Sequence, residues 1–309
     1  MSTRAQRRLD SMPGPILVTG ALGFVGAHLL DRLGKRAQPT EADVTDSSAL
    51  AEAVRAAAPS AIVHLAAISS VPGAANDPED AWTVNTIGTV NVLEAARSHA
   101  PEARVLFAST SEVYGQAEEV PTTEEAPLAP VSQYAASKSA AEMACDVARR
   151  GGLDVVVSRA FQHEGPGRDE RFAVGSWTAQ IARAEEAGGG TVLVGNLSGR
   201  RDITDVRDVC RAYELLLDPS VRTDTYNIAS GRTVEMREVL ELLVGLARCP
   251  IQVEPDPTRS RPNDLAIACG DASRLRAATG WTPSIPLEQT LTDTLDHARR
   301  SVAARMAGP

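Results

Sequence analysis

The sequence has little of several features that mark whole classes of protein. Its 309 residues carry a formal net charge of −9, whereas a nucleic-acid surface needs a basic stripe. No run of about 18 or more apolar residues occurs, so we expect no membrane span. The basic segment 1–15 has no apolar stretch of the kind found in secretory signals. We expect this segment to be a disordered leader.

Cysteine is scarce and scattered along the chain. The four residues are Cys145, Cys210, Cys249 and Cys269, and no two of them form a Cys-x-x-Cys pair. That spacing indicates neither a zinc site nor a redox motif, so we expect no metal. It also fits a reducing compartment, which predicts a cytoplasmic protein.

Aromatic residues make up only 4% of the chain. Three of them, Phe161, Phe172 and Trp177, flank a loop-like stretch. They could line a pocket, but large apolar residues belong to the core more often.

What the chain does have is a regular alternation of apolar strands and helices. Strands are expected within 15–20, 61–67, 103–110 and 153–161, and helices within 23–34, 48–60, 80–100 and 132–152. Continuous apolar strands that alternate with helices predict a parallel sheet with both faces covered. The expected fold class is therefore α/β, with a doubly wound Rossmann sheet.

The pattern changes after Phe161. A loop, a helix and a strand follow, and the tail holds helix candidates at 235–248, 271–280 and 287–306. The apolar strand within 224–230 could return to the main sheet. We expect a Rossmann domain over 16–161 plus 200–230, and a smaller, mostly helical substrate domain over 162–199 plus 231–309.

A glycine-rich turn joins the first strand to the first helix. Gly20, Gly23 and Gly26 follow the spacing Gly-x-x-Gly-x-x-Gly. Glycines allow a tight turn and close backbone approach, so that a dinucleotide pyrophosphate can lie on the helix N-terminus. Such a triplet alone is a weak signal, but the flanking strand and helix favour a dinucleotide site over an ordinary loop.

The second strand of that unit is missing from the pattern. Between Gly26 and Asp43 there is room for little beyond the helix, so this strand must be very short or absent. No acidic residue is well placed for a ribose 2′-hydroxyl, the usual partner of such an acid. Lys35 and Arg36 lie where a 2′-phosphate could bind, which favours NADP, with NAD as the alternative. Equally, they could be the solvated cations common at a helix end.

Three polar residues suggest proton transfer. Tyr134 and Lys138 are four residues apart on a predicted helix and so share a face. A neighbouring ammonium favours the phenolate and lowers the pKa of a tyrosine, which would let Tyr134 exchange a proton with a ligand oxygen. Thr110 follows a strand at the carboxyl edge of the sheet, where such folds bind ligands.

The order of these motifs resembles that of the extended short-chain dehydrogenase/reductases that act on nucleotide sugars. The similarity runs nearly end to end, through "TGALGFVG", "ADVTD", "HLAA", "VNTIGT", "STSEVYG", "YAASK", "GPG", "RDITDVRDVCRAY", "YNIASG", "RPND" and "GWTPSIPLEQTL". It implies a homodimer formed by the helices around 82–99 and 132–149.

The resemblance also implies roles for individual residues. The catalytic set would be Thr110, Glu112, Tyr134 and Lys138. The cofactor would contact Gly20, Gly23, Phe24, Val25, Gly26, Arg36, Asp43, Val44, Leu65, Ala66, Ala67, Tyr134, Lys138 and Phe161. The substrate would contact Ser111, Gln162, Asn196, Arg201, Arg261 and Asp264. Arg168 is expected to be solvated, and His163 to be a loop residue near the nicotinamide.

Within the family, the chain looks most like the GDP-sugar branch, which holds GDP-mannose 4,6-dehydratases and GDP-4-keto-6-deoxymannose reductases. Its compact length and shortened cofactor region resemble the reductases, whereas Glu112 is found in dehydratases and in some reductases alike. Gln162 replaces the family's usual Asn, which leaves the exact sugar open. A 4,6-dehydratase or 4-epimerase with retained cofactor is the first alternative. A non-catalytic sugar-nucleotide sensor is a remote one.

Overall fold

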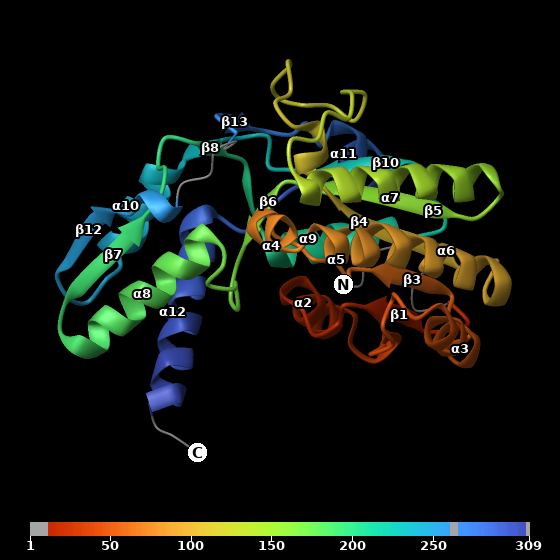
Figure 1. Cartoon of the computed structure of the whole chain (residues 1–309), viewed down its shortest axis with the longest axis horizontal. Coiled ribbons are helices and arrows are strands. Elements are labelled where there is room, and N and C mark those ends of the chain that lie inside the picture. Colours follow the sequence, from red (N-terminus) through yellow and green to blue (C-terminus); the bar gives the residue numbers. More distant parts are fainter. Residues whose placement is uncertain (1–11, 260–264, 307–309) are drawn as a thin grey trace.

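A six-stranded parallel sheet forms the centre of the molecule (Figure 1). The computed structural model describes residues 12–259 and 265–306. The strand order is β10-β5-β4-β3-β1-β2, and every neighbouring pair is parallel. The strands are β1 (Ile16–Thr19), β2 (Ala37–Pro39), β3 (Ala61–His64), β4 (Arg104–Thr110), β5 (Val155–Ala160) and β10 (Thr225–Ile228). The predicted fold class is confirmed, as is the return of β10 to the main sheet.

Successive strand residues feed two hydrophobic clusters, one on each face of the sheet. Ile16 and Val18 of β1 pack into the first cluster, and Leu17 packs into the second. The first face is covered by α2 (Phe24–Leu33), α9 (Val206–Leu216) and α11 (Ser273–Thr279). The second face is covered by α3 (Ser47–Ala57), α6 (Gly88–His99) and α7 (Gln133–Arg150). Because strand side chains alternate between faces, burial of both faces explains the continuous apolar runs.

The helix predicted over 80–100 is interrupted by a π-helical turn. The α5 helix (Pro78–Trp82) leads into η2 (Thr83–Ile87), and α6 follows. At the turn, Asn85 accepts a hydrogen bond from the backbone N–H of Ile68 at 2.8 Å and donates one to Ser137 Oγ at 2.9 Å. The turn thereby ties the loop after β3 to α7. Single π-helical turns are frequent at functional sites.

A third hydrophobic cluster lies to the left of the main sheet in Figure 1. It is built from α8 (Ala173–Ala187), α10 (Met236–Gly245), α12 (Leu287–Met306) and the parallel pair β7 (Gly190–Val194) and β12 (Ile251–Pro255). Short connecting elements complete the chain: η1 (Gly34–Arg36), α4 (Val71–Asn76), η3 (Ser111–Tyr114), β6 (Gln162–Glu164), β8 (Arg200–Arg201), β9 (Ile203–Asp205), β11 (Val234–Glu235), η4 (Pro257–Arg259) and β13 (Ile267–Ala268). None of the described helices is long and apolar enough to cross a membrane.

A buried ion pair attaches α7 to the sheet. Glu142 of α7 accepts a 2.6 Å contact from Arg159 of β5, and the two side chains are 5% and 9% exposed. Ser109 of β4 donates a hydrogen bond to the same carboxylate. Arg159 also donates to the hydroxyl of Tyr114 at 3.0 Å. One carboxylate thus joins the helix that carries Tyr134 and Lys138 to the two central strands β4 and β5.

Removing this carboxylate tests its role. We expect Glu142→Ala to lower the free energy of unfolding by about 3–5 kcal/mol, because Arg159 is then left buried without its counter-charge. Urea unfolding followed by circular dichroism measures the change. The control is Glu94→Ala, since Glu94 pairs with Arg97 at the surface, where the side chains are 57% and 64% exposed and such pairs contribute little. Equal urea midpoints for the two variants would contradict the assignment.

Candidate active site

A cavity of about 1520 Å³ opens at the carboxyl ends of β1, β3, β4 and β5. Its other wall comes from the third cluster, including Trp177 of α8 and Met236 of α10. A pocket for one drug-sized ligand has roughly 300–1,000 Å³, so this cavity has room for more than one ligand. No group of acidic, His and Cys side chains within 12–259 and 265–306 could hold a metal ion.

The glycine turn forms one end of the cavity. Gly20 has a φ of +66°, and a Cβ atom there would lie 2.6 Å from the backbone nitrogen of Ala66. A Cβ atom on Gly26 would lie 2.5 Å from the carbonyl oxygen of Gly20. The N-cap residue of α2, Gly23, supplies no side-chain hydrogen bond. The first N–H groups of α2 are therefore left for an anion, as a pyrophosphate site requires.

Ten of the predicted cofactor residues line this cavity: Gly20, Gly23, Phe24, Val25, Gly26, Leu65, Ala66, Ala67, Tyr134 and Phe161. Asp43 and Val44 do not. The carboxylate of Asp43 accepts hydrogen bonds from the N–H and hydroxyl of Thr45, and Val44 is only 4% exposed in the core. Thr40, Glu41 and Ala42, which precede them in the chain, line the cavity in their place.

Arg36 does not line the cavity. This side chain points to α9, where its guanidinium lies 2.8 Å from the carboxylate of Glu214, which also pairs with Arg32. Glu214 is 4% exposed, so its charge has to be met by cations. The strand β2 is three residues long and ends at Pro39, as the short interval after Gly26 predicted. The acidic residue that reaches the cavity beyond it is Glu41.

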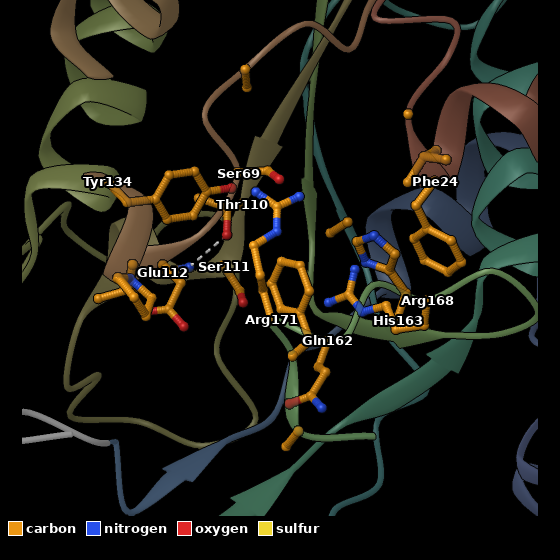
Figure 2. Close-up of a pocket in the computed structure, with 18 of the residues that line it drawn as sticks. Phe24, Ser69, Thr110, Ser111, Glu112, Tyr134, Gln162, His163, Arg168 and Arg171 are labelled. Carbon is orange, nitrogen blue, oxygen red and sulfur yellow. Dashed lines mark hydrogen bonds between the residues drawn. The ribbon is translucent and has the colours of Figure 1, made fainter. Parts of the chain in front are cut away.

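Thr110, Ser111, Glu112 and Tyr134 meet on one side of the cavity (Figure 2). Thr110 ends β4 and caps η3, where its hydroxyl accepts a hydrogen bond from the N–H of Glu112 at 3.2 Å. Ser132 caps α7 by accepting one from the N–H of Ala135 at 3.1 Å. Tyr134 therefore projects from the first turn of α7 toward the end of β4.

The pKa of Tyr134 differs in direction from the sequence-based expectation. Burial raises the pKa of this phenol to about 12, hydrogen bonding with Thr110 opposes the rise, and the nearby charge of Glu112 adds to it. Lys138 does not lower it. The phenol is thus protonated at neutral pH, and Tyr134 in this state can donate a proton.

Lys138 lies behind the cavity wall rather than on it. Its side chain is 2% exposed, and its ammonium lies 4.1 Å from the centre of the Phe107 ring. Burial lowers the pKa of Lys138 to about 8, while the charge of Glu142 opposes the change. The ammonium thus lies over the aromatic face of Phe107.

Four predicted substrate residues line the cavity: Ser111, Gln162, Asn196 and Arg201. Gln162 donates a hydrogen bond to Glu164 at 3.0 Å. Arg201 donates to the carbonyl oxygen of Leu265 at 2.7 Å, which fixes one of its nitrogens at the wall. Arg261 and Asp264 lie outside the described residues.

Comparison with known proteins gives the family of this chain. A sequence profile for GDP-mannose 4,6 dehydratase matches residues 34–294. The chain belongs to the GDP-mannose 4,6-dehydratase family. It is 35% identical to the GDP-6-deoxy-D-mannose reductase of Pseudomonas aeruginosa, over 89% of this chain and 94% of the relative. It is 30% identical to the UDP-glucose 4-epimerase of Mycolicibacterium smegmatis, over 92% and 98% of the two chains.

Solved structures give the same family and fold. The structure of Pseudomonas aeruginosa RMD complexed with NADPH matches with a TM-score of 0.85 and 33% identity, over 93% of this chain and 99% of that one. The Thermus thermophilus UDP-glucose 4-epimerase in complex with NAD matches with a TM-score of 0.83 and 29% identity, over 92% and 99%. The predicted resemblance to extended short-chain dehydrogenase/reductases is confirmed, and the relatives are enzymes.

Sequence analysis missed one part of this family site. Arg168 was expected to be solvated, but its side chain is 11% exposed and lies 3.2 Å from the carboxylate of Glu164. Its guanidinium carbon is 3.6 Å from the centre of the Phe172 ring and 5.0 Å from that of Phe24. The spacing of Glu164 and Arg168 is visible in the sequence, but the loop between them predicts no contact. Pairing with Glu164 is decided by the fold.

The other loop residues divide differently. His163 also lines the cavity, stacked on Phe24 with ring centres 6.1 Å apart. Phe161, Phe172 and Trp177 line it too. Phe161 and Trp177, each 3% exposed, belong to the core as well.

The altered pKa of Lys138 can be measured directly, because the chain has two lysines, Lys35 and Lys138. In protein labelled with ¹³C-lysine, we expect the Cε resonance of Lys138 to titrate near pH 8. Lys35→Met identifies this resonance, because it leaves Lys138 as the single lysine of the chain. Titration of the Lys138 signal above pH 10 would contradict the lowered pKa.

The same shift has a consequence for stability. The pKa of Lys138 is lower in the folded protein than in the unfolded chain, so the unfolded state binds more protons between about pH 8 and 10.5. The free energy of unfolding gained from this group rises with pH across that window. Relative to wild type, Lys138→Met should therefore be more stabilised at pH 7 than at pH 10.

Proposed function

We propose that the chain is a reductase of a nucleotide-linked 4-keto-6-deoxy sugar, with GDP-4-keto-6-deoxymannose as the favoured substrate. The observation that carries this proposal is the protonated phenol of Tyr134 beside Thr110, in a cavity with room for a dinucleotide and a nucleotide sugar. Further support is the 35% identity with a GDP-6-deoxy-D-mannose reductase.

The residues divide the work as follows. When bound, the reduced nicotinamide supplies the hydride that reduces C4 of the keto sugar. Tyr134 donates its proton to O4, so that the carbonyl becomes a hydroxyl and the two-electron reduction is balanced. The hydroxyl of Thr110 hydrogen-bonds with the sugar O4 and with the phenol oxygen of Tyr134, and thereby orients the phenol. Lys138, one helical turn further along α7, does not lower the pKa of the phenol in the ligand-free protein, so its place in the proposed catalytic set rests on the family resemblance.

The first alternative is a 4,6-dehydratase or a 4-epimerase with retained cofactor. It is favoured by Glu112, which lines the cavity two residues after Thr110 and could act as a base. Relatives named GDP-mannose 4,6-dehydratase, from Yersinia enterocolitica and other organisms, are 28–30% identical to the chain. A non-catalytic sugar-nucleotide sensor remains the remote alternative, for which a reactive phenol is not needed.

The proposed cofactor is NADPH, as in the Pseudomonas complex, with NADH as the alternative. With Arg36 held by Glu214, the cation that meets a 2′-phosphate has to come from elsewhere. Glu41 at the cavity would favour a free ribose hydroxyl. Substrate assays with NADPH and with NADH show which of the two dinucleotides the protein prefers.

We further propose the two-domain division expected from the sequence, 16–161 plus 200–230 and 162–199 plus 231–309. Its support is the separation of the third hydrophobic cluster from the two that cover the main sheet. The four cysteines are free, which fits the proposed cytoplasmic location.

A paired assay tests the function. We expect purified protein to oxidise NADPH only when GDP-4-keto-6-deoxymannose is present, and to form no keto sugar from GDP-mannose. Tyr134→Phe should lower kcat about 100-fold or more, because the proton donor is lost. The control is Tyr226→Phe, which removes a hydroxyl bonded to the carbonyl of Arg222, away from the cavity.

Other outcomes assign the alternatives. Keto sugar formed from GDP-mannose, and lost in Glu112→Gln, would identify a dehydratase. Consumption of NADH in preference to NADPH would identify NADH as the cofactor and would support binding of its free ribose hydroxyl by Glu41. Binding of GDP-sugars without turnover in either tube would favour the sensor.

We also propose a homodimer formed through α6 and α7. Exposed apolar side chains gather on these helices and on the turns before them: Trp82, Ile87, Val90, Met143 and Val147. Met143 and Val147 are 62% and 70% exposed, one helical turn apart. Solvent-facing residues of this size on adjacent helices are typical of an interface.

Charge placed on this surface should separate the subunits. We expect sedimentation of the wild type to give the mass of two 32.6-kDa chains, and Met143→Glu/Val147→Glu to give one, because the carboxylates cannot be desolvated in an apolar interface. Leu246→Glu, at a 37% exposed site after α10, should leave the mass unchanged. A monomeric wild type would refute the homodimer.

A further inference from the structure

Arg168 makes close contacts with two aromatic rings and a buried carboxylate at the cavity. Its guanidinium carbon lies 3.6 Å from the centre of the Phe172 ring and 5.0 Å from that of the Phe24 ring. Its Nε atom faces Glu164 at 3.2 Å. In Figure 2, Arg168, His163 and Phe24 lie together, across the pocket from Tyr134 and Thr110. Two aromatic rings and one carboxylate therefore surround part of the guanidinium.

The partner carboxylate is more deeply buried than the arginine. Glu164 is 1% exposed, and both its Oε2 atom and Arg168 Nε lack a well-aligned hydrogen bond. Buried charges with incomplete hydrogen bonding lower stability relative to an apolar pair of similar size. Native proteins rarely leave such atoms unpaired. The pair is thus better explained by ligand binding than by stability.

The outer edge of the guanidinium has no protein acceptor. Across residues 12–259 and 265–306, the structure gives Arg168 one ion pair, with Glu164, and no hydrogen bond from its two terminal nitrogens. Both Arg168 and Glu164 line the cavity. Other charged groups around it are Glu112 across the pocket, and Asp169 and Arg171, which pair with each other at the rim.

The position of Phe24 indicates which anion this edge meets. Phe24 is the first residue of the ten-residue helix α2, and its N-terminal N–H groups are uncapped by side chains. A pyrophosphate bound there carries about two negative charges, and the glycine turn supplies only N–H groups and the partial charge of a helix dipole. The Arg168 guanidinium carbon, 5.0 Å from the centre of the Phe24 ring, therefore lies beside the residue that begins this helix.

We propose that Arg168 binds the pyrophosphate of the nicotinamide dinucleotide from the side opposite the glycine turn, and that Glu164 and Phe172 are its positioning residues. This inference rests on the proposed function, because it assumes a dinucleotide in the cavity. Arginine suits the task because its terminal nitrogens form a planar pair that matches two phosphate oxygens. The segment 162–172, which leads into α8, would thereby contribute to cofactor binding.

Titration calorimetry without sugar substrate tests the proposal. We expect Arg168→Met to raise the Kd of both NADPH and NADH by about tenfold to a hundredfold, since charge-assisted hydrogen bonds are lost. Methionine keeps the stacking between Phe24 and Phe172. The Kd of GDP should stay unchanged. The matched control is Arg55→Met, whose 62% exposed side chain pairs with Glu52 away from the cavity and whose loss should leave all three values unchanged.

The variants also separate binding from folding. We expect Arg168→Lys to recover part of the affinity, and Glu164→Gln to raise the dinucleotide Kd less than Arg168→Met does, with urea midpoints recorded for each. A Kd of NADPH and NADH that does not change in Arg168→Met would overturn the proposal. So would a change confined to NADPH, which means a 2′-phosphate contact, or confined to GDP, which means the substrate diphosphate.

The outcome is distinguishable from failure of the proposed function. The titrations need no turnover, so a protein that binds both dinucleotides but reduces no keto sugar would refute the reductase alone. Conversely, normal reduction by Arg168→Met with wild-type dinucleotide affinity would refute the role of Arg168 alone.

Discussion

The buried pair of Glu142 and Arg159 is the interaction on which the geometry of the site depends. It joins α7 to β5 across an interface where both side chains are almost fully buried, and Ser109 adds β4 to the same carboxylate. Because Tyr134 and Lys138 precede Glu142 by eight and four residues on one helix, their positions follow from this attachment. The π-helical turn at Asn85 reinforces it by bonding Ser137. Orientation of the phenol toward Thr110 is a consequence.

Burial, more than pairing of charges, sets the protonation states around the cavity. It raises the pKa of Tyr134 and lowers the pKa of Lys138. The ligand-free site therefore favours a neutral phenol, and the ammonium of Lys138 loses its proton more readily than an exposed one. An anionic ligand then has to be met by arginines, because the chain has a net charge of −9 and two lysines. Arg168 and Arg201 both line the cavity.

Most of the fold was predictable from local pattern. The apolar runs at 15–20, 61–67, 103–110 and 153–161 gave the central strands because burial on both faces leaves a distinct mark on the sequence. Short strands such as β6, β8 and β13 have two or three residues, too few for any periodicity. The π-helical turn was likewise invisible, because its residues keep the apolar spacing of a helix.

Sequence by itself determined the family, the parallel sheet and the residues of the cavity floor, from Gly20 and Leu65 to Thr110 and Tyr134, because motifs at strand ends converge in any doubly wound fold. Tertiary structure decided where the charges point. Arg36 looked free for a phosphate but pairs with Glu214 from a distant helix. Arg168 looked solvated but is 11% exposed and lies near two aromatic rings. The partner of a side chain can come from a segment far away in the chain, and the local sequence does not show which distant segments the fold brings close.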